Sequence, residues 1–334
     1  MKKTIFLFFC LFTLNLISFG QAQKKFTHLP VFDIHVHTMK VNPNWGAPMC
    51  PWFLSNMPGT DPNLPMVDIT NVDCVDPLLP AKSDEEMQDE VIKRIHDFNM
   101  TMVAFGDAEI LYNWVNAAPP GRIIPGIGLN KASELTVEAF RDSLSNGFYK
   151  VMAEVAPQYE GLSPSDMSLD PYFAIAEEFG IPVGIHMGTG GNGQANTYQP
   201  SYRASMGNPF LLEDLLARHP KLKIWVMHAG YPMLEEMIAL MGANAYVYLD
   251  ISGFIWSYPL DEIHYYIKRL VQAGFGKRII YGTDFMIWPE LFETSMRVIE
   301  SAQYLSEDQK RDILFNNAVR FFNMDKSMFD WPKN

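Results

Sequence analysis

The sequence predicts an α/β fold, a closed (β/α)8 barrel of the TIM type with a long insertion after its first strand. Eight short apolar segments recur along the chain, and nearly all of them are followed by a helical pattern, which indicates a parallel sheet. The length of 334 residues accommodates eight such β/α units. Metal-compatible side chains stand at the ends of five of these segments. This spread favours the barrel over its competitor, a doubly wound open sheet.

The composition limits the classes of function that the chain can have. It is 48% hydrophobic and 19% charged, as expected for a globular protein with a large core. The formal net charge is −12, and no run of basic residues occurs. Nucleic-acid binding is therefore excluded, because neutralising phosphates needs a clustered positive face. The expected partners are a small-molecule substrate and, as one option, a second copy of the chain.

The first 22 residues have the pattern of a signal peptide. Lys2 and Lys3 form a positive region, residues 4–19 are largely apolar, and Gly20 and Ala22 are the small residues of a cleavage site. Cleavage would leave a single domain, 23–334, in the periplasm or outside the cell, with no other membrane contact. An uncleaved anchor is the alternative, although the apolar run is short for a membrane span.

The barrel is expected to begin with a strand at 32–38, an apolar run that contains His35 and His37. Because side chains along a strand alternate between its two faces, these rings lie on the same face. Neutral imidazole is a common ligand of transition metals, so the pair can bind one ion. An ordinary strand that holds two histidines is the alternative that this segment alone leaves open.

A Pro-rich, irregular segment at 39–82 follows the first strand. Long loops of this kind often serve as lids or binding loops. Trp45 and Trp52 in this insertion are candidates to contact a substrate. Cys50 and Cys74 also lie in it, and disulfides persist in exported proteins. Whether their Cα atoms are close enough for a bond is a question that the sequence leaves open.

Strands and helices alternate from residue 83 onward. A capping box of Ser83 and Glu86 begins the first helix, and Ser306 with Gln309 begins the last. Glycines at 147 and 180 follow two other helices as stop signals. The predicted helices cover 83–99, 133–146, 170–179, 209–218, 233–241, 260–273, 290–304 and 306–323. The predicted later strands cover 102–105, 123–129, 149–155, 182–186, 223–228, 245–251 and 278–281.

Chemistry in such a barrel gathers at the carboxyl ends of the strands, where the βα loops begin. A capping role is the ordinary alternative for each polar residue taken singly, but the common placement of several indicates one site. The residues at these ends are His35, His37, Glu154, His186, His228 and Asp284, with Asp250 near the end of the seventh strand. The remaining histidines, expected to be structural or solvated, are His28, His96, His219 and His264.

Four motifs give the chain a resemblance to the amidohydrolase superfamily. They are Asp33-x-His35-x-His37, Gly180-Ile-Pro-Val-x-Ile-His186-x-Gly188, His228-Ala-Gly230-x-Pro232 and Tyr281-Gly-Thr-Asp284-Phe. Together with the runs at 208–223 and 313–322, they resemble the amidohydrolase-2 branch, which includes aminocarboxymuconate-semialdehyde decarboxylase-like enzymes. The resemblance covers about residues 31–323 and implies a metal-dependent (β/α)8 barrel.

The resemblance also implies roles for the strand-end residues. His35, His37, His186 and Asp284 match the ligands of one divalent ion, most often Zn²⁺. His228 matches a catalytic base or electrophile in members with one ion, and a ligand of a second ion in members with two. Glu154 then matches a bridging carboxylate, unless it only orients a ligand histidine. Lys150 shares the parity of Glu154 but is expected to lie deeper in the barrel.

The predicted activity is hydrolysis of an amide, ester or lactone bond by metal-activated water. Asp284 would accept the proton of that water, and His228 would stabilise the oxyanion or act as acid–base. A metal-dependent decarboxylase is the alternative, with Arg203 as a candidate cation for a carboxylated substrate. A binding protein without catalysis is a third option. Trp256 and Trp288 join the two tryptophans of the insertion as candidates for an aromatic wall around the substrate.

Overall fold

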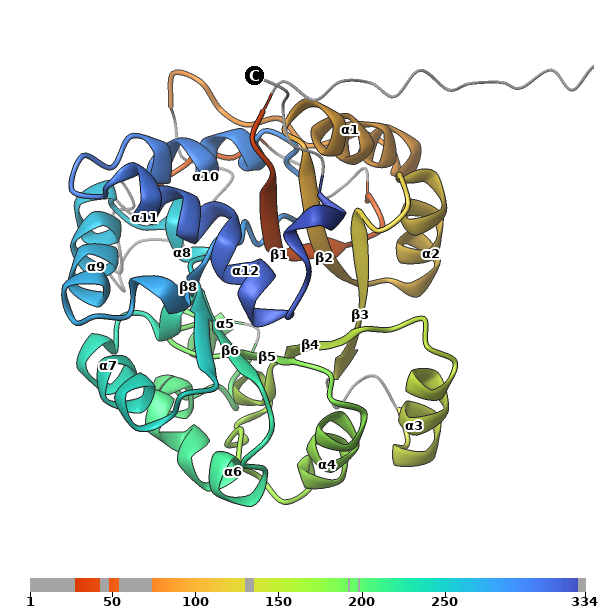
Figure 1. Ribbon diagram of the computed structural model, residues 1–334, viewed down its shortest axis with the longest axis vertical. Coiled ribbons are helices and arrows are strands. Elements are labelled where there is room, and N and C mark those ends of the chain that lie inside the picture. The colour runs from red at the N-terminus through yellow and green to blue at the C-terminus, as the bar shows by residue number, and fades with distance from the viewer. Residues whose placement is uncertain are drawn as a thin grey trace, which may run out of the picture.

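The structure, a computed structural model, describes residues 28–42, 48–53, 74–129, 135–191, 193–197 and 199–329. Eight parallel strands follow one another around a barrel in sequence order, and helices surround them (Figure 1). The predicted (β/α)8 barrel is confirmed. The strands are β1 (Val31–Thr38), β2 (Met100–Gly106), β3 (Ile123–Leu129), β4 (Val151–Val155), β5 (Val183–His186), β6 (Ile224–Met227), β7 (Val247–Asp250) and β8 (Ile279–Ile280).

The segment after β8 returns to β1 and brings the two ends of the sheet together. Val36 and Phe285 form a parallel bridge. The N–H of His37 donates to the Phe285 carbonyl at 2.8 Å, and the N–H of Asp284 donates to the His35 carbonyl at 2.9 Å. The first and last strands of the barrel therefore become neighbours, although residues such as Asp33 and Thr283 are 250 positions apart in the sequence.

The helices agree with the predicted ones, with some differences in extent. The last predicted helix contains a π-helical segment at Asp312–Asn316 between α11 and α12. Three helices, α2 and the short α5 and α8, are not among the predicted ones. Asp107 caps α2 by accepting from the N–H groups of Glu109 and Ile110. The helices are α1 (Asp84–Asp97), α2 (Ala108–Ala117), α3 (Val137–Ser145), α4 (Asp170–Phe179), α5 (Gln194–Thr197), α6 (Glu213–Arg218), α7 (Leu234–Ala243), α8 (Phe254–Ser257), α9 (Leu260–Gln272), α10 (Leu291–Glu300), α11 (Glu307–Arg311) and α12 (Asn317–Phe321).

Two apolar layers hold the barrel together. The outer layer packs the strands against the surrounding helices, and the inner cluster fills the barrel itself. Phe32, Trp225 and Phe321 belong to the inner cluster and are buried. α12, which contacts β1 and β8, contributes Phe321 and so closes the end of the barrel where the strands begin. The opposite end, where the strands finish, carries the polar residues.

Register shifts in two strands decide which side chains face the barrel interior. In β1 the shift lies between Asp33 and Val36, and in β4 it lies between Met152 and Val155. Ala153 belongs to the inner cluster, whereas Met152 belongs to the outer layer. The expectation that Lys150 lies inside the barrel is wrong. Lys150 precedes β4, is exposed, and donates to the Gly147 carbonyl at 2.5 Å.

The described ends of the insertion dock on the loops after β7 and β8. The N–H of Ala81 donates to the Ile287 carbonyl at 3.0 Å, and the indole of Trp52 donates to the Ile255 carbonyl at 3.3 Å. Cys50 and Cys74 form a disulfide bond, with Cα atoms 5.9 Å apart. The proposed signal peptide and Trp45 lie outside the described residues. Within the described residues, no helix has the length and apolar character needed to span a bilayer.

Candidate metal centre

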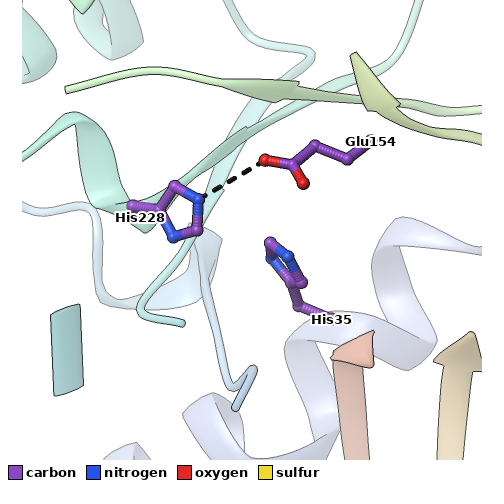
Figure 2. A group of neighbouring side chains, drawn as sticks. All are labelled: His35, Glu154 and His228. Atoms are coloured by element: carbon purple, nitrogen blue, oxygen red, sulfur yellow. Dashed lines mark ion pairs between the residues drawn. The ribbon is translucent and has the colours of Figure 1, made fainter. Parts of the chain in front are cut away.

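The carboxyl ends of five strands bring all six predicted side chains into one cluster. His35 and His37 come from β1, Glu154 from β4 and His186 from β5, while His228 and Asp284 follow β6 and β8. Figure 2 shows that His228 and Glu154 point toward each other from different elements, with His35 facing the space beside them. The cluster lies at the end of the barrel where (β/α)8 enzymes carry their chemistry.

One group consists of His35, His37 and Asp284, and its geometry fits a metal ion. The two Nε2 atoms are 3.2 Å apart. Oδ1 of Asp284 lies 3.4 Å from Nε2 of His35 and 3.0 Å from Nε2 of His37. Ligand atoms at about 2.0–2.1 Å from a tetrahedral Zn²⁺ are separated by about 3.3 Å. The three atoms therefore have the spacing of three corners of such a site.

The Glu154 carboxylate connects this group to the other two histidines. Its Oε2 lies 3.6 Å from Nε2 of His37. Its Oε1 lies 2.5 Å from Nδ1 of His186 and 3.6 Å from Nε2 of His228. A second group of potential ligands, His35, Glu154 and His228, has its ligand atoms within 4.8 Å of one another. One carboxylate oxygen thus faces each side of the cluster, as a bridging ligand would.

His186 lies on the Glu154 side of the cluster. Its Nδ1 is 3.0 Å from Nε2 of His228, and its Nε2 is 3.0 Å from the Tyr159 hydroxyl. Its ring also packs beside that of Tyr159, with centroids 4.6 Å apart. The structure therefore brings His186 into the cluster but not into the group of His35, His37 and Asp284. Its ligand role, implied by the family resemblance, stays a prediction.

Asp250 and Ser252 lie directly behind two of the histidines. Oδ2 of Asp250 is 3.1 Å from Nδ1 of His35, and its Oδ1 accepts from the backbone N–H of His228 at 2.9 Å. The Ser252 hydroxyl donates to Oδ1 of Asp250 at 2.6 Å and lies 2.8 Å from Nδ1 of His35. Metal-binding histidines usually have such a partner on their second nitrogen, which orients the ring.

Asp33, the first residue of the His-x-His motif, holds the backbone beneath the site. Its carboxyl accepts from the N–H of His35 at 3.0 Å, from the N–H of Thr283 at 3.0 Å and from the Thr283 hydroxyl at 2.6 Å. Burial raises the pKa of Asp33 to about 7, although these hydrogen bonds oppose the rise. Asp33 therefore ties β1 to the residue before Asp284 and is not itself a ligand candidate.

Opposite charges control protonation inside the cluster. Burial opposes ionisation of Glu154, but His186, His228 and His37 outweigh it and hold the pKa of Glu154 well below its usual value. Burial likewise opposes charge on His228, yet Glu154, Asp284 and Asp250 raise its pKa to about 9. The pKa of Asp284 is lowered because His35 and His37 overcome the effect of burial. Without an ion, the site therefore pairs ionised carboxylates with a protonated His228.

The residues predicted to contact substrate have mixed surroundings. Trp256 and Trp288 are each only 6% exposed, and the Trp256 indole donates to the Thr283 carbonyl at 2.6 Å. Trp52 is partly buried against the same region. The Arg203 guanidinium donates to the carbonyls of Pro200 and Tyr202 at 2.8 and 2.7 Å. The substrate role of these side chains stays a prediction.

Three residues of the site were not predicted to have a role there: Asp250, Ser252 and Tyr159. Asp250 stands at a strand end, and that position is the signal that points to it. Ser252 lies in the turn after β7 and Tyr159 in a short 3-10 helix after β4, and no sequence pattern distinguishes either residue. Their places follow from the course of the chain after β7 and β4.

Comparisons with known proteins identify the family to which the chain belongs. The sequence model of the amidohydrolase family Amidohydro_2 matches residues 32–324. A curated 2-amino-3-carboxymuconate-6-semialdehyde decarboxylase from Caenorhabditis elegans is 24% identical over 140 residues, which cover 39% of this chain. The match spans only 35% of that relative's length.

Several solved structures share the fold at low sequence identity. An uncharacterised TIM-barrel protein from Bordetella bronchiseptica has a TM-score of 0.59 and 17% identity, over 88% of this chain and 99% of that one. A probable 2-pyrone-4,6-dicarboxylic acid hydrolase from Acinetobacter baumannii has a TM-score of 0.54 and 12% identity, over 89% of this chain and 100% of that one. A 2,6-dihydroxybenzoate decarboxylase from Rhizobium has a TM-score of 0.51 and 15% identity, over 89% of this chain and 98% of that one. With the family match covering most of its length, the chain belongs to the amidohydrolase family and is an enzyme of that superfamily.

Proposed function

We propose that this enzyme is a metal-dependent hydrolase that cleaves an amide, ester or lactone bond of a small molecule. The observation that supports this best is the position of Glu154. One of its carboxylate oxygens faces His37 and the other faces His186 and His228. The two oxygens of Glu154 would serve two divalent ions, for which we propose zinc. Two ions would favour hydrolysis, because they would supply Lewis acidity for both the attack of water and the departure of the leaving group.

The protein side chains supply the proton transfers of such a reaction. A bound divalent ion supplies Lewis acidity toward a substrate oxygen and toward water. Asp284, ionised because of its lowered pKa, is the group that accepts the proton of the attacking water and returns it to the leaving group. His228, with a raised pKa, faces the centre through Nε2 and donates to the oxygen on which charge develops.

Metal content and product analysis test this proposal. We expect purified protein reconstituted with Zn²⁺ to hold two ions per chain by elemental analysis, and Glu154→Gln to hold fewer. Turnover of model esters and lactones in ¹⁸O-labelled water should place the label in the product. Release of CO₂ without uptake of label would contradict hydrolysis, and a wild-type protein that binds no metal would contradict any metal-dependent activity.

A decarboxylase is the second candidate, and the curated relative from Caenorhabditis elegans bears that name. His228, which lies beside His186 with Nε2 toward the centre, would serve as the acid–base in that reaction. The surroundings of Arg203 do not favour it, because its guanidinium already donates to two backbone carbonyls. Carboxylated aromatic compounds assayed for CO₂ release distinguish the two reactions.

We also infer that the protein is exported and works in an oxidising compartment. The pattern of residues 1–22 supports this, as does the disulfide between Cys50 and Cys74, since such bonds are rare in the reducing cytosol. N-terminal sequencing of protein recovered from a bacterial periplasm should start at Gln23. A protein that keeps residue 1 and stays with the cytosol would contradict the inference.

A further inference from the structure

The Asp250 carboxylate lies between two histidines of the site and makes contacts with both. It is fully buried and accepts from four donors. Oδ1 accepts from the N–H of His228 at 2.9 Å, the N–H of Ser252 at 3.0 Å and the Ser252 hydroxyl at 2.6 Å. Oδ2 lies 3.1 Å from Nδ1 of His35. This one side chain therefore contacts the ring of His35 and the backbone of His228.

Counting protons around Ser252 shows whether Nδ1 of each ring carries a proton. A serine hydroxyl has a single proton, and Ser252 donates it to Asp250. Oγ of Ser252 can therefore only accept from Nδ1 of His35 at 2.8 Å and from Nδ1 of His228 at 3.2 Å. Nδ1 of His228 also faces the Ser252 carbonyl at 3.1 Å, which can only accept. Nδ1 carries a proton in each ring.

We propose that Asp250 and Ser252 form a positioning pair that sets the tautomer and orientation of His35 and the placement of His228. With the proton on Nδ1, Nε2 of His35 has a free lone pair. That atom is the one that lies 3.2 Å from Nε2 of His37 and 3.4 Å from Asp284. Only the part concerning ion binding rests on the proposed function, because the tautomers are a property of the protein alone.

The Asp250→Asn substitution tests the pair in a directed way. Three donors hold the amide oxygen at the Oδ1 position, so the amide N–H₂ must face Nδ1 of His35. An N–H₂ group donates, and the ring then accepts at Nδ1 and carries its proton on Nε2. That tautomer offers no lone pair to an ion. We expect Zn²⁺ affinity to fall about 10–100-fold, the range for loss of such partners.

The control is a second aspartate–histidine pair away from the site, in which His219 is buried and Asp170 is partly buried. Asp170 lies 3.0 Å from Nε2 of His219 and also accepts from Arg218. Asp170→Asn should change stability but leave Zn²⁺ affinity unchanged. Ser252→Ala keeps the Asp250 contact and should cause a smaller loss than Asp250→Asn. Affinity is measured by competition with a chromophoric chelator for each purified full-length mature protein.

The protons on the ring nitrogens are read directly by ¹H–¹⁵N NMR of the histidine rings in the metal-free protein. We expect Nδ1–H for His35 and His228 in the wild type and a change to Nε2–H for His35 in Asp250→Asn. A wild-type His35 with its proton on Nε2 would overturn the inference, even if the variant failed to fold. Unchanged Zn²⁺ affinity in a folded Asp250→Asn would also overturn it. A wild type that binds no Zn²⁺ would refute the proposed function, while the NMR result would still test the pair.

Discussion

Gly253 offers a sharp test of how closely the chain packs against the proposed catalytic groups. It follows β7 with φ 61° and ψ −57°. A Cβ atom added there would lie 2.7 Å from Oδ2 of Asp284 and 3.0 Å from Nδ1 of His228. Ordinary contacts of a Cβ begin at 3.4 Å, so Asp284 would have to move by about 0.7 Å, and a shift of about 1 Å in a catalytic group can cost about 100-fold in rate.

Gly253→Ala should therefore lower kcat/KM for a model ester or lactone by about 10–100-fold. Strained backbone at this position adds about 1–3 kcal/mol of lost stability. The control is Gly180→Ala, because Gly180 also has a positive φ of 66° but no atom within 4 Å of the added Cβ. That variant should lose about 1–2 kcal/mol of stability and keep its activity. Full activity in folded Gly253→Ala, or an equal loss in Gly180→Ala, would refute the reasoning.

Three further predictions concern stability away from the site. Phe321→Ala removes a ring that is 1% exposed from the inner cluster. It should lower the free energy of unfolding, measured in urea, by about 3–5 kcal/mol and leave Zn²⁺ affinity intact. A loss under about 1 kcal/mol would show that α12 does not close the barrel. Reduction of the Cys50–Cys74 bond, which spans a sequence separation of 24, should cost about 3 kcal/mol by loop entropy, and an unchanged Tm after reduction would contradict this. Burial opposes the charge of Asp170, but Arg218 and His219 outweigh it and hold its pKa below the ordinary 3.8. The ionised Asp170 therefore stabilises the fold above about pH 4, and this contribution is lost as the pH falls through the pKa of Asp170 in the folded protein. The free energy of unfolding of Asp170→Asn should then fall less at acid pH than that of the wild type. Parallel curves of unfolding free energy against pH for the two proteins would refute this expectation.

The barrel was predictable because its signals are repeated and local. The prediction depends on eight apolar runs separated by helical patterns, so an error in one run does not change the predicted fold. In addition, the side chains of Ser83 and Ser306 cap the helices that follow them and so mark where these helices begin. α2 escaped prediction for a related reason. Its Asp107 cap is a single residue, and aspartate is equally common in turns. Where a helix depends on one local signal, tertiary packing supplies the rest of its stability.

The candidate site was predictable at the level of residue type and strand end, but its hydrogen-bonding partners were not. Histidines and carboxylates at strand ends indicate a candidate metal centre, because few other roles need them together. Ser252 and Tyr159 become part of the site only through backbone geometry. Left-handed φ values of 56° at His228 and 58° at Asp284 turn the chain beside them. Such conformations are held by the surrounding structure rather than by local propensity.

The two register shifts explain why strand alternation alone could not assign the ligands. Strict alternation in β1 would place His35 opposite Ile34, yet Ile34 belongs to the inner cluster and His35 also faces the site. The shift between Asp33 and Val36 makes both possible and leaves Asp33 bonded to Thr283. The same device in β4 places Ala153 inside the barrel and Glu154 in the site. Bulges of this kind re-aim side chains beside active sites. A two-residue period contains no signal for such bulges, so the position at a strand end indicates that Glu154 belongs to the site, but alternation alone does not give the direction of its side chain.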